Sequence, residues 1–322
     1  MSPRAKDPLP EFVDPMLATL WPAGFDDPDW LYEIKWDGFR VETVVDGDRV
    51  TMWTRGQQDA ARYFGPFLAP PTWLAAATAI FDGEVVGLDL DGEPDFSLLQ
   101  ADLRDAAGGQ LVYQVFDLLY VDGTSLLEQP LEDRKARLAA VLRPDPRVRF
   151  SEHVVGEGLA FLEVARQRRL EGVMAKHRRS PYLPGKRSDR WRKFKIRPEQ
   201  ELVVGGFARG LGSAADLGAL SIGVYEDGRL RYAGKVGAGF NNASRRAELL
   251  QLLEPLVRET TPFDPPPPRR LQAGVLWVEP TVVIRAELAG WTSNGIVRQA
   301  SYKGLDIGKD PAKVVREVPG KR

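Results

Sequence analysis

Residues 32–55 read YEIKWDGFRVETVVDGDRVTMWTR, and this stretch decides the fold of the first half of the chain. Apolar and charged side chains alternate through residues 32–36 and again through 39–45, the period of two expected of half-buried β-strands. Asp46-Gly47 then supplies the turn chemistry of a β-hairpin. The sequence therefore predicts a strand that ends in a Lys-Trp-Asp-Gly segment, followed by a hairpin.

The rest of the first 198 residues mixes strand-like and helical stretches. Residues 1–29, rich in Pro and Asp, are expected to form an irregular arm. The other predicted elements are strands at 81–92, 111–123, 172–178 and 190–196, and helices at 131–143 and 158–170. We therefore predict a mixed-sheet α+β domain over residues 1–198.

From residue 199 the sequence changes to short strand-like runs separated by glycine turns. One helical stretch at 244–257 and a four-proline break at 265–268 interrupt these runs. Several short strands with one helix in about 120 residues are typical of a small closed barrel. Residues 199–322 are therefore expected to form a second, β-barrel domain.

Charge is distributed unevenly along the chain. Lysine plus arginine (44) nearly balances aspartate plus glutamate (45), for a formal net charge of −1. Residues 166–197, however, hold thirteen basic side chains against Glu171 and Asp189, a local balance of +11. A basic segment of this kind attracts a polyanion even when the protein is neutral overall.

Composition excludes several classes of site. The chain has no cysteine and two histidines, His153 and His177, which rules out disulfides, thiolate zinc sites and cysteine nucleophiles. A hard cation held by carboxylates and phosphates is compatible with this composition. No signal peptide and no run of about 18 apolar residues is found, so we expect no membrane partner and a cytoplasmic location.

Lys35 is the candidate for covalent chemistry. A lysine amine attacks phosphorus only when deprotonated, and its ordinary pKa is about 10.4. Burial or nearby cations lower that pKa, and Arg40, Arg55, Lys193 and Lys195 would supply such charge and also neutralise phosphates. The alternative interpretation is a surface hairpin with alternating charges and a turn glycine.

Six short motifs occur in order along the chain: KWDGFR (35–40), WTRG (53–56), FDGE (81–84), VFD (115–117), EGVMAK (171–176) and WRKFK (191–195). Together they resemble the motifs of the covalent nucleotidyltransferases, which comprise DNA ligases, RNA ligases and mRNA capping enzymes. The resemblance covers residues from about 10 to 315 and implies an adenylation (nucleotidyltransferase) domain followed by an OB-fold. The sequences of residues 15–38 and 286–305 resemble those of bacterial stand-alone ligase C and of the ligase domain of ligase D.

The resemblance implies a role for each matched residue. Lys35 would form a covalent bond to AMP, Phe116 would stack on the adenine, and Glu84 would accept hydrogen bonds from the ribose hydroxyls. Glu84 and Glu171 would help to hold a metal. The other implied nucleotide-binding residues are Arg40, Arg55, Lys176, Lys193 and Lys195. Two roles remain open for Glu33: its carboxylate would accept a hydrogen bond from the adenine amine, or it would face solvent.

Each of these residues also has a plain structural interpretation. Glu84 follows Asp-Gly and would simply end a turn, and Phe116 would be a core residue on a strand. Glu171 precedes a glycine and would cap a helix. Lys176 and the lysines of WRKFK would lie on a solvated, charged strand.

The function implied by the resemblance is that of an ATP-dependent DNA ligase active in DNA repair. It would seal 3′-OH/5′-phosphate breaks through a lysyl-AMP and a DNA-adenylate, assisted by Mg²⁺ or Mn²⁺. Its partner would be nicked or broken double-stranded DNA, with any polymerase or end-binding repair protein on a separate chain, and a monomer is expected. The alternatives are an RNA ligase or capping-type enzyme, and a non-catalytic DNA-end-binding protein with a decayed ligase fold.

One departure from the family concerns its C-terminal R-x-D-K motif, whose basic residues orient the pyrophosphate of ATP. In this chain Lys309 matches the final lysine, but Asp306 stands where arginine is expected and Gly308 where aspartate is expected. A carboxylate repels a triphosphate, so this departure predicts slow self-adenylylation, reliance on another cation (Arg298 or Lys303), or a protein that has drifted from the family's activity.

Overall fold

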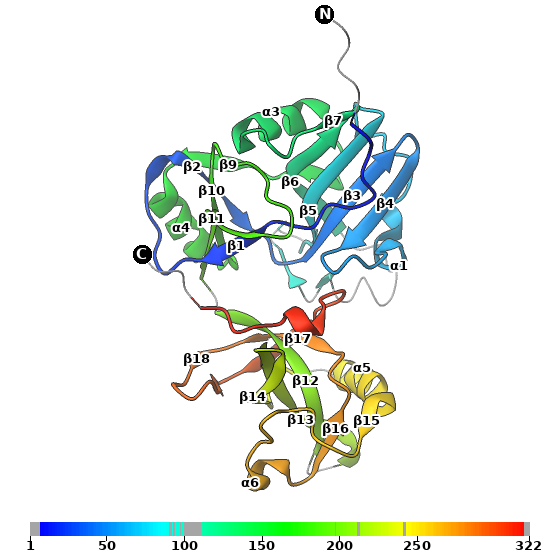
Figure 1. Ribbon diagram of the computed structural model, residues 1–322, viewed down its shortest axis with the longest axis vertical. Helices are drawn as coiled ribbons and strands as arrows, with labels where there is room; N and C mark the ends of the chain where they lie inside the picture. The colour runs from blue at the N-terminus through cyan, green and yellow to red at the C-terminus, as the bar shows by residue number, and fades with distance from the viewer. Residues whose placement is uncertain are drawn as a thin grey trace, which may run out of the picture. The chain divides into compact units, whose positions relative to one another are not determined.

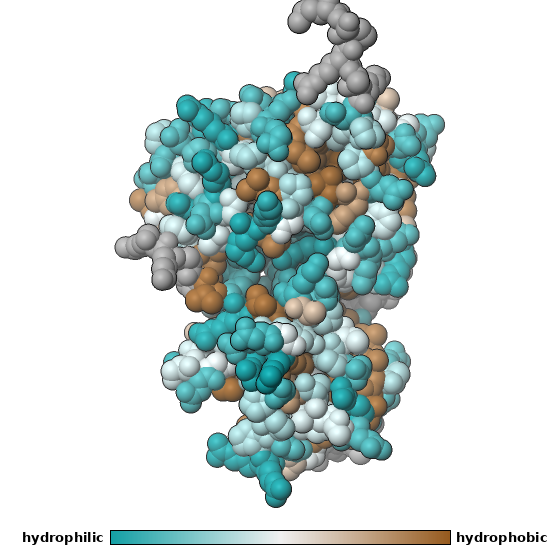
Figure 2. All heavy atoms as spheres, in the orientation of Figure 1, coloured by the Kyte–Doolittle hydropathy of each residue, from teal (hydrophilic) through white to brown (hydrophobic). Residues whose placement is uncertain are grey.

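The computed structural model describes residues 7–318 except 90, 91, 93, 97, 100–110, 197, 211, 212, 241 and 242, and the backbone alone at 213–216. The chain divides into two compact units, residues 1–197 with 318–322 and residues 198–317 (Figure 1). Apolar side chains form separate cores in the two units, and hydrophilic residues dominate the visible surface (Figure 2). Within the described part of the chain, no helix is long and apolar enough to cross a membrane.

The first sheet of unit 1 has the strand order β1-β11-β10-β2-β9 and is antiparallel except for the β1–β11 pair. Its strands are β1 (Leu17–Leu20), β2 (Asp27–Lys35), β9 (His153–Gly156), β10 (Gly172–His177) and β11 (Arg187–Lys195). Helix α4 (Gly158–Gln167) covers one face, where Tyr32, Val173 and Phe194 pack with Leu162 of the helix. Because successive strand residues point to opposite faces, the residues that alternate with these lie on the other face.

The second sheet has the order β4-β3-β5-β6-β7, with β8 parallel to β6. Its strands are β3 (Phe39–Asp46), β4 (Arg49–Thr54), β5 (Thr78–Gly87), β6 (Leu111–Val121), β7 (Thr124–Ser125) and β8 (Val148–Phe150). The short helices α1 (Ala61–Phe64) and η1 (Gly65–Phe67) follow β4, and α3 (Leu131–Val141) packs on β6. Strand β6 is buried over ten of its eleven residues, which explains its nearly continuous apolar sequence.

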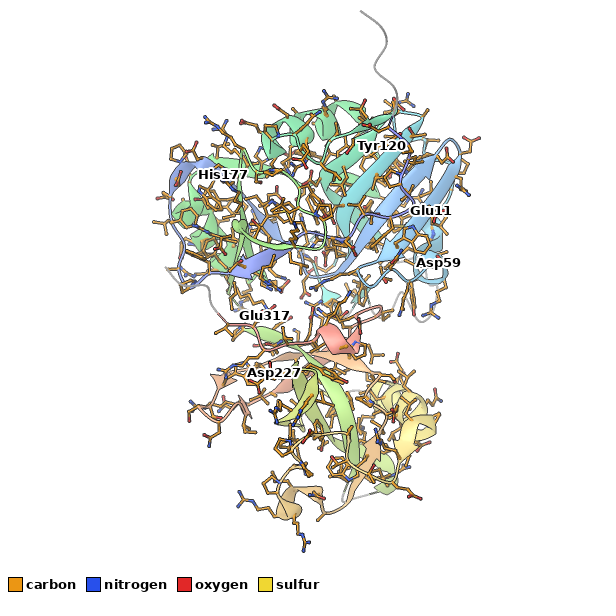
Figure 3. All side chains as sticks on the ribbon, in the orientation of Figure 1. Glu11, Asp59, Tyr120, His177, Asp227 and Glu317 are labelled. Carbon is orange, nitrogen blue, oxygen red and sulfur yellow. The ribbon has the colours of Figure 1, made fainter. Side chains whose placement is uncertain are left out.

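The two sheets of unit 1 share a core. Phe116 of the second sheet, Trp191 of the first and Tyr182 of the β10–β11 connection belong to one buried cluster. The N-terminal segment contributes Met16 to the same cluster. Nearer the N-terminus, the carbonyl of Asp7 accepts a hydrogen bond at 2.7 Å from the hydroxyl of Tyr120, which lies at the end of β6 near β7 (Figure 3).

Unit 2 is built around β12 (Glu199–Gly210), which pairs with β17 through its first residues and with β16 farther along. The other elements are β13 (Ser213–Glu226), β14 (Arg229–Val236), β15 (Val257–Arg258), β16 (Val275–Val278), β17 (Val283–Glu287), β18 (Gly290–Trp291), β19 (Val297–Arg298), β20 (Ser301–Leu305), α5 (Ala243–Leu253), α6 (Arg269–Gln272), η2 (Glu254–Leu256) and η3 (Pro311–Lys313). Because β12 pairs with β17 along one part of its edge and with β16 along the next, the sheet can curve, as a small barrel requires. The predicted fold class, a mixed-sheet domain followed by a β-rich OB-fold domain, is confirmed.

Several predicted boundaries were wrong. The arm at 1–29 contains β1 and the start of β2, because its residues pair with β11 and β9, which lie far along the chain. The strand expected at 81–92 runs from Thr78 to Gly87; residues 90 and 91 lie outside the described part. The helix expected at 244–257 ends at Leu253 and tightens into a 3₁₀ turn that contains Pro255.

Candidate active site

The charged face of the first sheet brings together residues from three motifs. The registers of β2, β10 and β11 place Lys35, Gly172 and Lys195 in one row and Glu33, Met174 and Lys193 in the next. Residues two apart on a strand share a face, so both rows lie opposite the α4 side. The sheet thus brings the Lys35 motif next to the Glu171 and Lys193 motifs, which lie more than a hundred residues farther along the sequence.

Close packing of backbone atoms explains why glycine is required at two motif positions, Gly38 and Gly172. A Cβ added to Gly38 would lie 2.1 Å from the carbonyl oxygen of Val85, and one added to Gly172 would lie 2.1 Å from that of Phe194. No side chain fits at such separations. These glycines let the strand ends that carry Lys35 and Glu171 pack against neighbouring strands.

Lys35 at the end of β2 forms an ion pair with Glu171, which directly precedes β10. The lysine side chain is 19% exposed and the glutamate side chain 2%, so the amine borders solvent while its partner is enclosed. Glu171 therefore does not cap a helix, since α4 ends at Gln167. The amine and a proton acceptor are in contact at the place where the sequence predicts a nucleophile.

A buried charge cluster lies beside this pair. Glu33 Oε1 accepts from Lys135 Nζ and Glu33 Oε2 from Lys176 Nζ, each at 2.8 Å, and all three side chains are 2% exposed. Burial would raise the pKa of Glu33, but Lys135 and then Lys176 outweigh it and lower that pKa. Burial, followed by repulsion from Lys135, lowers the pKa of Lys176 despite its attraction to Glu33. The solvent-facing interpretation of Glu33 and the solvated interpretation of Lys176 are both wrong.

Phe116 on β6 lies where the two sheets meet. The Lys176 ammonium is 4.2 Å from the Phe116 ring centroid and 4.3 Å from that of Trp191, and the Arg40 guanidinium is 5.5 Å from the Phe116 centroid. Cations at these distances are attracted to the faces of aromatic rings. Phe116 is thus a core residue, as its plain interpretation had it, and its ring also has two cations close by.

Arg40 is held by a chain of hydrogen bonds that ends in the N-terminal segment. Its guanidinium donates to both oxygens of Asp82, at 2.9 and 2.6 Å. The Tyr182 hydroxyl donates to Asp82 at 2.7 Å and accepts from the backbone N–H of Met16 at 2.9 Å. Burial opposes the charge of Arg40, but Asp82 outweighs it and raises the pKa of Arg40. Arg40 therefore stays charged at this half-buried position.

Glu84 and Arg55 belong to the second sheet. Glu84 on β5 is half-buried and lies opposite Arg40 on β3 and Gln114 on β6. It is therefore part of a strand rather than the end of a turn. Arg55 directly follows β4 and is also half-buried.

The carboxylates of the site fit a magnesium ion only in part. Among the residues described, no group of three or more His, Cys, Asp or Glu side chains could hold a metal ion. Mg²⁺ commonly takes one or two protein carboxylates and completes its shell with substrate phosphates and water. Glu84 and Glu171 are compatible with that limited role.

Several residues of this site were missed at the sequence level. Lys135 lies on α3 and Tyr182 in a connection, and neither belongs to a recognisable motif. The available signal for Lys135 was its spacing: it lies four residues after Leu131 and three before Leu138, on the apolar face of the predicted helix. Asp82 and Trp191 were quoted within motifs but given no role.

In unit 2, the residues of the C-terminal motif make contacts of their own. Lys309 Nζ lies 2.5 Å from Glu201 Oε2, and the lysine side chain is 6% exposed. The backbone N–H of Asp306 donates to the carbonyl of Val283 at 2.9 Å. Lys303 Nζ lies 4.0 Å from Glu199 Oε1, and Arg298 is exposed on β19. Lys309 is thus tied to β12 in this arrangement.

Comparison with known proteins gives the family. A family model described as "ATP dependent DNA ligase domain" matches residues 15–195, which include all six motifs. The chain belongs to the ATP-dependent DNA ligase family. A second family model, "ATP dependent DNA ligase C terminal region", matches residues 213–307 of unit 2.

Individual relatives agree with this assignment. The chain is 38% identical over 325 residues to the multifunctional non-homologous end joining protein LigD of Pseudomonas aeruginosa, a match that covers 98% of this chain and 38% of the relative. It is 36% identical to LigD of Mycobacterium tuberculosis, covering 94% of this chain and 40% of that protein. The chain therefore spans about two fifths of the length of these curated relatives.

Two solved structures resemble the whole chain. One is described as mycobacterial DNA ligase D complexed with ATP and MES, with a TM-score of 0.66, 35% identity and coverage of 95% of this chain and 98% of that one. The other is the ligase domain of M. tuberculosis LigD, with a TM-score of 0.52 and the same identity and coverage. The predicted resemblance to ligase D is confirmed.

Proposed function

We propose that this chain is an ATP-dependent DNA ligase that seals 3′-OH/5′-phosphate breaks through AMP bound covalently to Lys35. One observation carries the proposal: the Lys35 amine contacts the Glu171 carboxylate on the sheet face that also carries Lys176, whose ammonium lies against the Phe116 ring. Membership of the ATP-dependent DNA ligase family, and a similar structure that contains ATP, support the choice of nucleotide.

The first chemical step follows from these contacts. The Lys35 amine attacks the α-phosphorus of ATP, a P–N bond forms, and the bond to the bridging oxygen breaks to release pyrophosphate. Glu171 is placed to take the proton that Lys35 must lose. Lys193 and Lys195 share the face of the sheet with Lys35 and would neutralise phosphate oxygens, as would Arg40 and Arg55. Phe116 would stack on the adenine and Glu84 would bind the ribose.

Two further steps complete the reaction on DNA. The 5′-phosphate of a break attacks the lysyl-AMP phosphorus, which frees Lys35 and leaves AMP on the DNA end. The adjacent 3′-OH then attacks the 5′-phosphorus, the backbone bond forms and AMP leaves. A Mg²⁺ or Mn²⁺ ion at Glu171 and Glu84 would neutralise charge on the phosphates.

The substrate and setting belong to the same proposal. The basic stretch at 166–197 suits the duplex backbone, and the LigD relatives are named for non-homologous end joining. We therefore propose nicked or broken duplex DNA as substrate, double-strand break repair in the cytoplasm as the setting, and a monomer as the active form. A polymerase or end-binding protein would act alongside it.

A direct test uses ATP labelled at the α-phosphorus and a nicked duplex. The wild-type protein is expected to form a covalent AMP adduct and to seal the nick, and Lys35→Ala to do neither. Lys235→Ala, which alters an exposed lysine of β14, is the matched control and should behave as wild type. An adduct of equal yield in Lys35→Ala would refute the assignment of the nucleophile.

The same experiment separates the alternatives. Labelling by GTP rather than ATP, or sealing of RNA but not DNA, would identify a capping-type enzyme or an RNA ligase. DNA binding without any adduct would identify a non-catalytic end-binding protein.

A further inference from the structure

Lys135 connects helix α3 to the centre of the site. Its ammonium donates to Glu33 Oε1 at 2.8 Å, to the carbonyl of Ser151 at 3.1 Å and to the carbonyl of Phe116 at 3.5 Å. The ring of Phe150 lies 4.6 Å from the same nitrogen. Lys135 thus uses its three donors on three different strands or connections, one of which carries the aromatic residue proposed to stack on adenine.

Glu33 divides its carboxylate between two lysines. While Oε1 binds Lys135, Oε2 binds Lys176, whose ammonium lies against the Phe116 and Trp191 rings. The cluster holds two cations and one anion, a buried formal charge of +1. An excess charge is costly to bury, so its retention against the Phe116 ring points to a role beyond folding.

We infer that Lys135 is a positioning residue for nucleotide binding, because it fixes Glu33 and thereby holds Lys176 against the Phe116 ring. Lys135 is linked to Phe116 in two ways. It donates a hydrogen bond to the Phe116 carbonyl, and through Glu33 it holds Lys176 against the Phe116 ring. The inference rests on the proposed function, in which Phe116 binds the base.

The charges that face Glu33 make this inference testable by pH. Lys135 from α3 and Lys176 from β10 contact its oxygens, His153 lies opposite it on β9, and Lys193 lies in the same row on β11. Burial and then Lys135 lower the pKa of His153, which keeps that ring uncharged near neutral pH. Without Lys135, burial is opposed by Lys176 alone and the pKa of Glu33 rises. Glu33 would then take up a proton at a higher pH and release Lys176.

The test measures AMP binding by titration calorimetry without metal between pH 5 and 8. Lys135→Met is expected to bind AMP about tenfold more weakly at pH 7, the loss of one hydrogen bond to a charged group. Its affinity should also begin to fall at a higher pH than that of wild type. Lys135→Gln retains a donor for Glu33 without the charge and should show the same shift, which covers the case in which Lys135→Met does not fold.

Two controls lie on the same helix. Arg137→Met removes an exposed cation and should change neither affinity nor its pH dependence. Leu138→Ala leaves a gap in the buried face and should lower the melting temperature, with the pH dependence of AMP binding unmoved.

Two results would count against the inference, in different ways. If wild type binds AMP, and both Lys135 variants bind it with unchanged affinity and pH dependence, the positioning role is wrong while the ligase proposal stands. If wild type neither binds AMP nor forms the Lys35 adduct, the proposed function is wrong and the role of Lys135 falls with it.

Discussion

The Lys176 ammonium lies 4.2 Å from the centroid of the Phe116 ring, so a cation from the first sheet rests against an aromatic ring from the second. This contact joins two motifs that are about sixty residues apart in sequence at the junction of the sheets. Its partners on either side, Glu33 and Trp191, are buried as well. The proposed base-binding wall is therefore a product of the packing between the two sheets.

The first prediction concerns Phe116. Phe116→Leu removes the ring while keeping an apolar side chain, and we expect an apparent affinity for ATP about two- to tenfold weaker, since ring stacking contributes about 0.5–1.5 kcal/mol. Adduct formation at varied ATP concentration measures this. Phe81→Leu is the control, because Phe81 packs against Trp73 in a different part of the second sheet. Equal losses in the two variants would show that Phe116 acts only through packing.

The second prediction concerns the Arg40–Asp82 pair. Asp82→Ala leaves the Arg40 guanidinium without its bidentate acceptor and should lower the free energy of unfolding by about 3–5 kcal/mol. The double variant Arg40→Met/Asp82→Leu removes both charges and should be more stable than Asp82→Ala alone. Urea denaturation measures both. A double variant less stable than Asp82→Ala would contradict the view that an unpaired buried charge causes the loss.

The third prediction is the effect of pH through Glu42. This carboxyl is 2% exposed, and burial raises its pKa from 4.5 to about 9. The folded protein then binds one proton more than the unfolded chain between these values, so this group makes the protein less stable as pH rises from about 4.5 to 9. Glu42→Gln, which cannot ionise, should stabilise the protein by up to about 3 kcal/mol at pH 7 and have little effect at pH 4.

Unfolding by urea at a series of pH values checks the Glu42 prediction. The backbone N–H of Val13 donates to Glu42 Oε1 at 2.7 Å, and glutamine keeps an acceptor for it. A difference between wild type and Glu42→Gln that does not grow with pH would show that Glu42 is ionised in the folded protein.

The fourth prediction concerns Gly38 in the Lys35 motif. Gly38→Ala would place a methyl group 2.1 Å from the Val85 carbonyl oxygen, and we expect a loss of about 3 kcal/mol or more in the free energy of unfolding. Gly65→Ala is the matched control, since no atom lies within 4 Å of its added Cβ. Thermal unfolding of the two variants measures the contrast, and a tolerated Gly38→Ala would show that the strands separate easily here.

The fifth prediction concerns the C-terminal motif. Lys309 is tied to Glu201, so Glu201→Gln should release the lysine and speed lysyl-AMP formation by up to about fivefold, the effect of an ion pair that contributes up to about 1 kcal/mol. Sealing of a nick that already carries AMP should not change, because pyrophosphate has no part in it. Acceleration of both steps alike would mean that Glu201 acts on something other than the ATP step.

Sequence alone determined the strands, the hairpin and the motifs, because strand alternation, turn residues and catalytic residue types are local properties of the chain. The period of two in residues 32–36 placed Glu33 and Lys35 on the same face of one strand, and β2 contains both, although its burial does not alternate because Glu33 is buried as well. Tertiary structure alone decided which charges meet. Glu33 reaches Lys135 and Lys176, 102 and 143 residues away, and Arg40 reaches Asp82 and Tyr182, because sheet register and inter-sheet packing are set by long-range burial that no short stretch encodes.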